Sequence, residues 1–233
     1  MKERKPIIGI VARSDVNKTE RNCMIALDRY RIAILKNGGI PIIILPTQQI
    51  SYEDVKVSEV PQLSDEEKDD LIKQIEICDG ILLPGGDKIY YYDTFVARYA
   101  LDNNIPLLGI CMGMQIMGIV DNEDFNCLVD VQNPQFHKKN LKGDCFHEIL
   151  IKKDTKLYKY FQKEHQIVNS IHAKVLSRLN KFQISAVSEY DEIEAIELND
   201  KKFAIGVQWH PELLLEKCTE MNMIFKDFIE KSK

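Results

Sequence analysis

Short apolar runs alternate with amphipathic segments through the first half of the chain. Four runs are almost entirely apolar, as strands covered on both faces usually are: residues 7–12, 41–45, 81–83 and 107–110. The segments between them are predicted as helices: 24–36, 64–77 and 93–102. The second of these opens with Ser64-Asp-Glu-Glu, which is the pattern of a capping box. This alternation predicts an α/β fold with a doubly wound, mostly parallel sheet flanked by helices.

Strand-like segments dominate the second half of the chain. Five of them alternate with turns: 146–151, 167–170, 184–188, 193–198 and 204–208. Helix is scarce until the amphipathic segment 213–231. We therefore predict additional antiparallel strands in the C-terminal half, joined to the parallel core. With 45% apolar residues, the chain can bury one sizeable core, so residues 1–233 are predicted to form a single domain.

The segment around Cys111 has the pattern of a nucleophile elbow. The apolar run 107–110 leads into Gly109-Ile-Cys111-Met-Gly113, and apolar residues at helical spacing follow. In such an elbow a buried strand turns sharply into a helix and exposes the residue at the turn. A cysteine there also lies at a helix N-terminus, which favours the thiolate. The alternative is an ordinary buried strand that happens to end in cysteine.

A second strand-end motif supplies a candidate base. The apolar segment 203–209 ends in His210-Pro-Glu212. A cysteine nucleophile needs a base, and the base needs a third group that fixes its tautomer. We predict that Cys111, His210 and Glu212 form this triad. Taken alone, His210 would more commonly be a capping or core histidine.

A glycine pair follows the strand at 81–83. Pro84-Gly85-Gly86-Asp87 leaves room for backbone N–H groups to face a developing oxyanion. The predicted oxyanion donors are the amides of Gly86 and Met112, with Gly85 as a further candidate. On its own, Pro-Gly-Gly is usually only a turn, and its position between a strand and the elbow gives it weight.

Together, the three segments resemble the class I glutamine amidotransferase superfamily. The N-terminal run Asn37-Gly-Gly-Ile-Pro resembles its peptidase C26 branch, which contains gamma-glutamyl-gamma-aminobutyrate hydrolases and gamma-glutamyl hydrolases. The resemblance covers essentially the whole chain. It implies a flavodoxin-like fold, a cysteine nucleophile and a gamma-glutamyl substrate. It also implies that the glutamyl group is bound by Gly85, Asp87, Gln115, Ser170, Ile171 and His172.

Several residues depart from the pattern of that branch. Met112 stands where arginine is usual, His172-Ala173-Lys174 replaces His-His-Gln, and Asp93 is the nearest match to a glutamate before the elbow. The catalytic groups are intact, while groups around the substrate differ. The sequence therefore predicts the chemistry better than it predicts the amine attached to glutamate.

Charge and composition exclude several classes of partner. The net charge of −5 offers no case for nucleic acid, and no apolar run approaches the ~20 residues of a membrane span. Six cysteines are scattered without paired spacing, and no signal peptide is recognisable, so a reducing cytoplasm is expected. The expected partner is a small gamma-glutamyl compound, and a homodimer is the default assembly.

The remaining histidines are predicted on loops or strand edges. A zinc site built from Cys145, His147 and His165 has no usual ligand spacing, so we expect neither a metal nor an organic cofactor. The basic segment 137–142 is predicted as a solvated loop.

Three functions remain open at this stage. The first is a stand-alone gamma-glutamyl hydrolase. The second is a glutaminase subunit that supplies ammonia to a separate synthase. The third is a catalytically silent protein that binds a gamma-glutamyl ligand.

Overall fold

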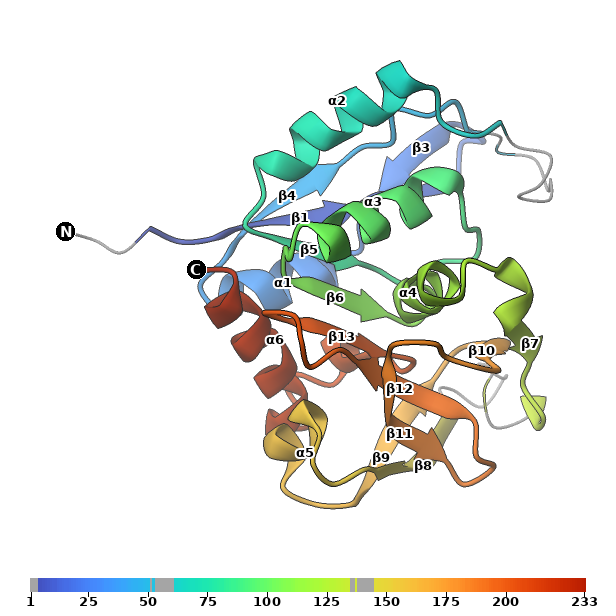
Figure 1. Cartoon of the computed structure of the whole chain (residues 1–233), viewed down its shortest axis with the longest axis vertical. Coiled ribbons are helices and arrows are strands. Elements are labelled where there is room, and N and C mark those ends of the chain that lie inside the picture. The colour runs from blue at the N-terminus through green and yellow to red at the C-terminus, as the bar shows by residue number, and fades with distance from the viewer. Residues whose placement is uncertain (1–3, 51, 53–60, 135–136, 138–144) are drawn as a thin grey trace.

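The computed structural model describes residues 4–50, 52, 61–134, 137 and 145–233. Within these residues a nine-stranded sheet runs through the molecule in the order β4-β1-β5-β6-β13-β12-β11-β8-β9 (Figure 1). Its parallel half consists of β4 (Ile40–Ile44), β1 (Ile7–Val11), β5 (Gly80–Leu83), β6 (Leu107–Ile110) and β13 (Ala204–Val207). Its antiparallel half consists of β12 (Ile193–Glu197), β11 (Gln183–Ser188), β8 (Cys145–Ile151) and β9 (His165–Ser170).

Helices cover both faces of the sheet. One layer contains α2 (Asp65–Glu76), α3 (Tyr91–Asp102) and α4 (Met112–Asn122), and the other contains α1 (Asp28–Lys36), α5 (Lys156–Phe161) and α6 (Thr219–Lys231), with α5 packed against β11 of the antiparallel half. Side chains of one strand alternate between the two cores: Ile81 and Leu83 pack in the first layer, and Leu82 in the second. The doubly wound, mixed sheet predicted from the apolar runs is therefore confirmed.

The start of α2 is fixed by the predicted capping box. The Glu67 amide donates to Ser64 Oγ at 3.3 Å, and the Ser64 amide donates to Glu67 Oε2 at 2.7 Å. These bonds satisfy two donors at the helix terminus that have no intrahelical acceptor.

The strand β13 joins the two halves of the sheet. It is parallel to β6, with Val207 opposite Ile110, and antiparallel to β12. Because parallel strands end at the same edge of a sheet, this pairing places the residues after Val207 beside Cys111. The sequence predicted the return of this strand to the site, but not its insertion beside β6.

Two predicted helix starts are wrong. Met24 and Ile25 belong to β3 (Asn22–Ile25), which forms a hairpin with β2 (Arg13–Val16), and α1 begins only at Asp28. Pairing with a partner strand outweighs the helical spacing of apolar residues there. The last helix begins at Thr219 instead of residue 213, since the short 3₁₀ turn η4 (Pro211–Leu213) comes first.

Several short elements were not predicted. These are β7 (Leu128–Asp130), which pairs with β10 (Lys174–Leu176), the 3₁₀ turn η2 (Phe125–Cys127) and α5. All are six residues or shorter, which leaves too few positions for a periodic pattern. Within the part of the chain that the structure describes, none of the helices has the length and hydrophobicity of a membrane span.

Candidate active site

Cys111 occupies the turn between β6 and α4. Its backbone has φ 53° and ψ −110°, in a region that residues other than glycine rarely adopt. The Cys111 amide donates to Val207 O at 2.8 Å, which ties the turn to the neighbouring strand β13. A strained, non-glycine residue held in this way is typical of functional sites. The strand–turn–helix context predicted for the elbow is present.

The two glycines that flank Cys111 are required by close packing. A Cβ at Gly113 would lie 2.0 Å from Leu83 O, and a Cβ at Gly109 would lie 2.7 Å from the carbonyl carbon of Gly113. Both contacts are with backbone atoms, which cannot move aside as the end of a side chain can. The elbow therefore depends on glycine at both positions.

The segment after β13 brings an imidazole and a carboxylate to the same edge of the sheet. His210 Nδ1 and Glu212 Oε1 lie 2.7 Å apart, and the Glu212 side chain is buried. Asn169 from β9 holds the His210 backbone on both sides: the His210 amide donates to Asn169 Oδ1 at 3.0 Å, and Asn169 Nδ2 donates to His210 O at 3.2 Å. The ring is thus oriented by a carboxylate and its backbone is fixed by a second strand.

The surroundings of His210 favour its protonated form. Burial of the imidazole lowers its pKa, but interactions with the side chains of Cys111 and Glu212 outweigh burial and raise the pKa to about 10. An imidazole in this state holds a proton that it can transfer to a leaving group.

The sulfur of Cys111 lies among polar groups of neighbouring segments. Gln208 Nε2 lies 3.6 Å from Cys111 Sγ, and Ile171 O lies 3.9 Å from it. Gln115 Nε2 donates to Gln208 Oε1 at 3.2 Å and to Lys174 O at 2.8 Å. Because Gln208 Oε1 accepts from Gln115, its amide nitrogen is turned toward the sulfur.

The glycine loop is anchored from two sides. The Gly85 amide donates to the Tyr30 hydroxyl at 3.0 Å, so this amide is engaged. Arg13 Nη2 donates to Pro84 O at 2.8 Å, and its Nη1 forms an ion pair with buried Asp93. Gly86 lines the cavity beside Cys111, and Met112 is the first residue of α4, where helix geometry leaves the amide without an acceptor inside the helix.

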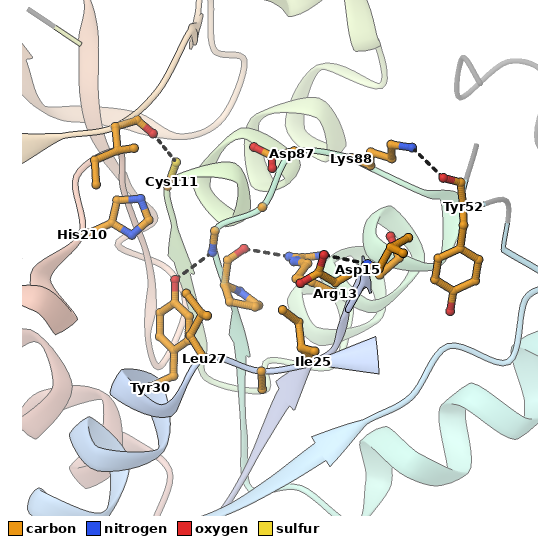
Figure 2. Close-up of a pocket in the computed structure, with 17 residues that line it drawn as sticks. Arg13, Asp15, Ile25, Leu27, Tyr30, Tyr52, Asp87, Lys88, Cys111 and His210 are labelled. Atoms are coloured by element: carbon orange, nitrogen blue, oxygen red, sulfur yellow. Dashed lines mark hydrogen bonds between the residues drawn. The ribbon is translucent and has the colours of Figure 1, made fainter. Parts of the chain in front are cut away.

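A cavity of about 450 Å³ opens beside Cys111 and His210 (Figure 2). Figure 2 shows Asp87 and Lys88 on the loop beyond the glycines, with Arg13 on the cavity wall. The charged groups of the cavity wall include both signs, which suits a zwitterionic ligand better than a purely apolar one. The wall consists of Arg13, Ser14, Asp15, Val16, Ile25, Ala26, Leu27, Tyr30, Tyr52, Pro84, Gly85, Gly86, Asp87, Lys88, Cys111, Ile171 and His210.

The residues predicted to bind substrate divide into two groups. Gly85, Asp87 and Ile171 line the cavity together with Cys111, Gly86 and His210. Gln115, Ser170 and His172 lie outside its lining, as do Met112, which was predicted as an oxyanion donor, and Glu212, the predicted acid of the triad. Ser170 Oγ instead contacts His137 Nδ1 at 3.0 Å, and His172 lies buried beside His137. The side chains of Ser170 and His172 therefore face His137, and neither lines the cavity.

The structure does not assemble the zinc site considered from the sequence. His165 is exposed and pairs with Glu148 at 3.2 Å, whereas His147 is buried and faces other histidines. His137 is also buried, so the prediction of a solvated loop is wrong at that residue. Residues 138–142 of that segment lie outside the described residues.

Four residues that position the site were missed. They are Arg13, Tyr30, Asn169 and Gln208, and each acts on a residue far away in the chain. Asn169 directly precedes Ser170 and Ile171, which the resemblance assigned to the substrate. Nothing in the local pattern around Arg13 indicated its partner, which is 80 residues away.

A family model for peptidase C26 matches residues 90–212, more than half of the chain. The chain belongs to the peptidase C26 family. A glutamine amidotransferase-like protein of Rickettsia prowazekii is 30% identical over 100% of this chain and 99% of the relative. CTP synthase of a Hydrogenobaculum species is 29% identical over 69% of this chain, which corresponds to only 35% of that enzyme.

Solved structures agree on the fold of this peptidase C26 member. The glutaminase domain of Trypanosoma brucei CTPS with bound acivicin superposes with a TM-score of 0.65 at 20% identity, covering 97% of this chain and 93% of that one. At this identity the likeness shows the fold alone. The family membership and this fold confirm the glutamine amidotransferase-like resemblance seen in the motifs.

Proposed function

We propose that this protein is a hydrolase that cleaves the gamma-glutamyl amide bond of a small compound through a covalent glutamyl thioester on Cys111. The main support is one observation: the strained elbow cysteine lies beside His210, whose Nδ1 is 2.7 Å from the buried carboxylate of Glu212. Nucleophile, base and orienting acid are the minimum set for acyl transfer through a thiol.

In the first half-reaction, Cys111 Sγ attacks the gamma-carbonyl carbon and forms a carbon–sulfur bond. The carbonyl electron pair moves to oxygen, where the amides of Gly86 and Met112 stabilise the negative charge. The carbon–nitrogen bond then breaks, and His210 gives its proton to the departing amine. The pKa of His210, raised to about 10, suits this role because the ring still carries its proton near neutral pH.

In the second half-reaction, water replaces the amine. His210 now takes a proton from water, and the resulting hydroxide adds to the thioester carbon. The carbon–sulfur bond then breaks, which releases glutamate and restores the sulfur of Cys111. Glu212 orients the ring in both halves and stabilises the imidazolium. Asp87 on the cavity wall suits the alpha-ammonium group of the glutamyl moiety, while Gln115 is assigned to orienting Gln208.

The rival function is a glutaminase that transfers ammonia to a separate synthase. Its support is the similarity to CTP synthase over 69% of this chain. The chemistry at Cys111 would be the same, but activity would depend on a synthase partner. A thiol nucleophile suits a reducing compartment, so we place either reaction in the cytoplasm and expect a small gamma-glutamyl substrate.

The test is glutamate release from a panel of gamma-glutamyl amides: glutamine, gamma-glutamyl-aminobutyrate and a folyl-type polyglutamate. Cys111→Ala should abolish release, and Cys23→Ala is the matched control, since Cys23 lies on β3 outside the cavity lining. Cys111-dependent release from one compound supports the hydrolase and identifies its substrate. Release that persists in Cys111→Ala contradicts the proposal, and release from glutamine only with a synthase present favours the rival.

A further inference from the structure

Three histidines and a glutamate meet in the antiparallel half of the molecule. His147 lies on β8, Glu194 on β12, His172 follows β9, and His137 comes from the segment before β8. One ligand atom from each residue lies within 4.8 Å of all the others, and all four residues are buried. Their side chains are at most 2% exposed.

Most of the polar atoms that face one another here have no hydrogen-bond partner. Among the described residues these are His137 Nε2, His147 Nε2, His172 Nδ1, His172 Nε2, Glu194 Oε1 and Glu194 Oε2. Leaving one such group buried and unsatisfied costs about 1–3 kcal/mol, and a carboxylate more. His137 Nε2 also lies 3.1 Å from Glu192 Oε2, a contact that is favourable only when the ring is protonated. So many unpaired atoms in one place indicate an absent binding partner.

Neighbouring groups turn the histidine lone pairs inward. His147 Nδ1 lies 3.1 Å from Glu148 O. Because a carbonyl oxygen can only accept a hydrogen bond, Nδ1 carries the proton, and Nε2 has the lone pair that could bind a metal. His137 Nδ1 contacts Ser170 Oγ at 3.0 Å, which suits the same tautomer. Histidines that bind metals are typically held through their other ring nitrogen in this way.

Burial disfavours the charged form of all three imidazoles. Burial lowers the pKa of His137 and of His147 and lowers that of His172 well below its usual value. Burial also raises the pKa of Glu194 well above its usual value, with Glu192 and Cys111 adding to it. Neutral imidazole is the form that coordinates a metal, and a cation beside Glu194 would stabilise its carboxylate.

We propose that His137, His147, His172 and Glu194 bind one divalent transition-metal ion, with zinc as the best fit. Zinc prefers four nitrogen, sulfur or oxygen ligands in a tetrahedron whose neighbouring ligand atoms lie about 3.3–3.5 Å apart. Glu194 Oε1 lies 3.6 Å from both His147 Nε2 and His172 Nε2. The remaining ligand atoms lie within 4.8 Å of one another, so the widest pairs must close by up to about 1.4 Å to complete the tetrahedron.

Four protein ligands leave no open position, so the ion is structural. It joins β8, β12 and the segments that carry His137 and His172, and the His172 amide already donates to His137 O at 2.7 Å. Ile171, directly before His172, presents its carbonyl to Cys111 Sγ. The metal therefore fixes the part of the cavity wall that Ile171 forms beside Cys111.

The experiment measures zinc in the purified full chain after dialysis, using Cys111→Ala as background so that the elbow thiol does not bind metal. We expect one zinc per chain. After chelation, zinc at about 1,000 times its Kd should raise the melting temperature by roughly 8–16 °C. Glu194→Gln and His147→Ala should lose both effects, whereas His165→Ala, an exposed histidine on β9, should keep them.

Two results would overturn the site. One is a chain that binds zinc only substoichiometrically and melts at the same temperature with and without it. The other is zinc binding that Glu194→Gln leaves unchanged. If both ligand variants fail to fold, X-ray absorption at the zinc edge of the parent chain decides: nitrogen and oxygen ligands support the site, and sulfur ligands refute it. None of these readouts depends on amide hydrolysis, so they are independent of the proposed reaction.

Discussion

Replacing Asp93 by asparagine should destabilise the protein strongly, although the shape of the side chain is conserved. Asp93 is fully buried, pairs with the guanidinium of Arg13 and accepts the Tyr90 amide at 2.9 Å. The substitution leaves Arg13, itself only 10% exposed, as an uncompensated buried cation. Breaking a buried pair in this way costs about 3–5 kcal/mol. At about 2–4 °C per kcal/mol for a chain of this size, the melting temperature should fall by roughly 6–20 °C.

A second variant tests the cause of that loss. Replacing both partners, Arg13→Met with Asp93→Leu, removes the two charges together, so stability should recover most of the loss. Amide hydrolysis should stay low, because Pro84 O loses its donor and the glycine loop loses an anchor. A misplacement of ~1 Å costs about 100-fold in rate.

The assays are calorimetric melting and glutamate release on the same preparations. The matched control is Asp79→Asn, which removes the acid of an exposed Arg–Asp pair and should change melting little. The reasoning is refuted if Asp93→Asn melts like Asp79→Asn. It is also refuted if the double variant is no more stable than Asp93→Asn, since buried charge would then not be the cause.

Two further variants test the elbow and the triad. Glu212→Gln should lower the pKa of His210 and shift the alkaline limb of the pH–activity profile to lower pH. It should also reduce kcat by roughly 10- to 150-fold, because a hydrogen bond to a charged group contributes about 1.5–3 kcal/mol. Because the pKa of His210 in the folded state is raised to about 10, the stability that its protonation contributes is complete below about pH 6.5 and is lost as the pH rises toward 10. In Glu212→Gln, the free energy of unfolding from urea titrations should depend less steeply on pH over this range. A pH dependence equal to that of the parent chain would contradict this account. Gly113→Ala should cost about 3 kcal/mol or more, because the methyl group meets Leu83 O at 2.0 Å. Gly118→Ala, where the methyl group meets only the Leu176 side chain, should cost less in the same melting assay, and equal losses would show that backbone crowding is not the cause.

The parallel half of the sheet and the elbow could be predicted because their signals are local. An apolar run marks each buried strand, and the two glycines of the elbow lie two residues before and two residues after Cys111. The pairing of His210 with Glu212 spans only two residues and was equally accessible. In each case the residues that carry the signal lie close together in the chain, even where the strands they form pair with distant ones.

The parts that could not be predicted depend on contacts between distant segments. Arg13 meets Asp93 across 80 residues, and Asn169 holds His210 across 41. The four proposed metal ligands are spread from His137 to Glu194 and meet only because of how the antiparallel strands are ordered. Their spacing matches no short ligand motif, so only the fold reveals them.

The position of β13 has a consequence for how the chain folds during synthesis. One edge of β6 is complete only when Val207 pairs with Ile110, which is 97 residues earlier. At about 5–20 residues per second, a ribosome needs roughly 5–20 s to supply that strand. Throughout this interval the edge of β6 that β13 covers in the folded protein has no partner strand, and exposed apolar edges pair with other chains. We therefore expect nascent chains that stop before residue 204 to depend on chaperones, and the elbow cysteine to gain its base only at the last step of folding.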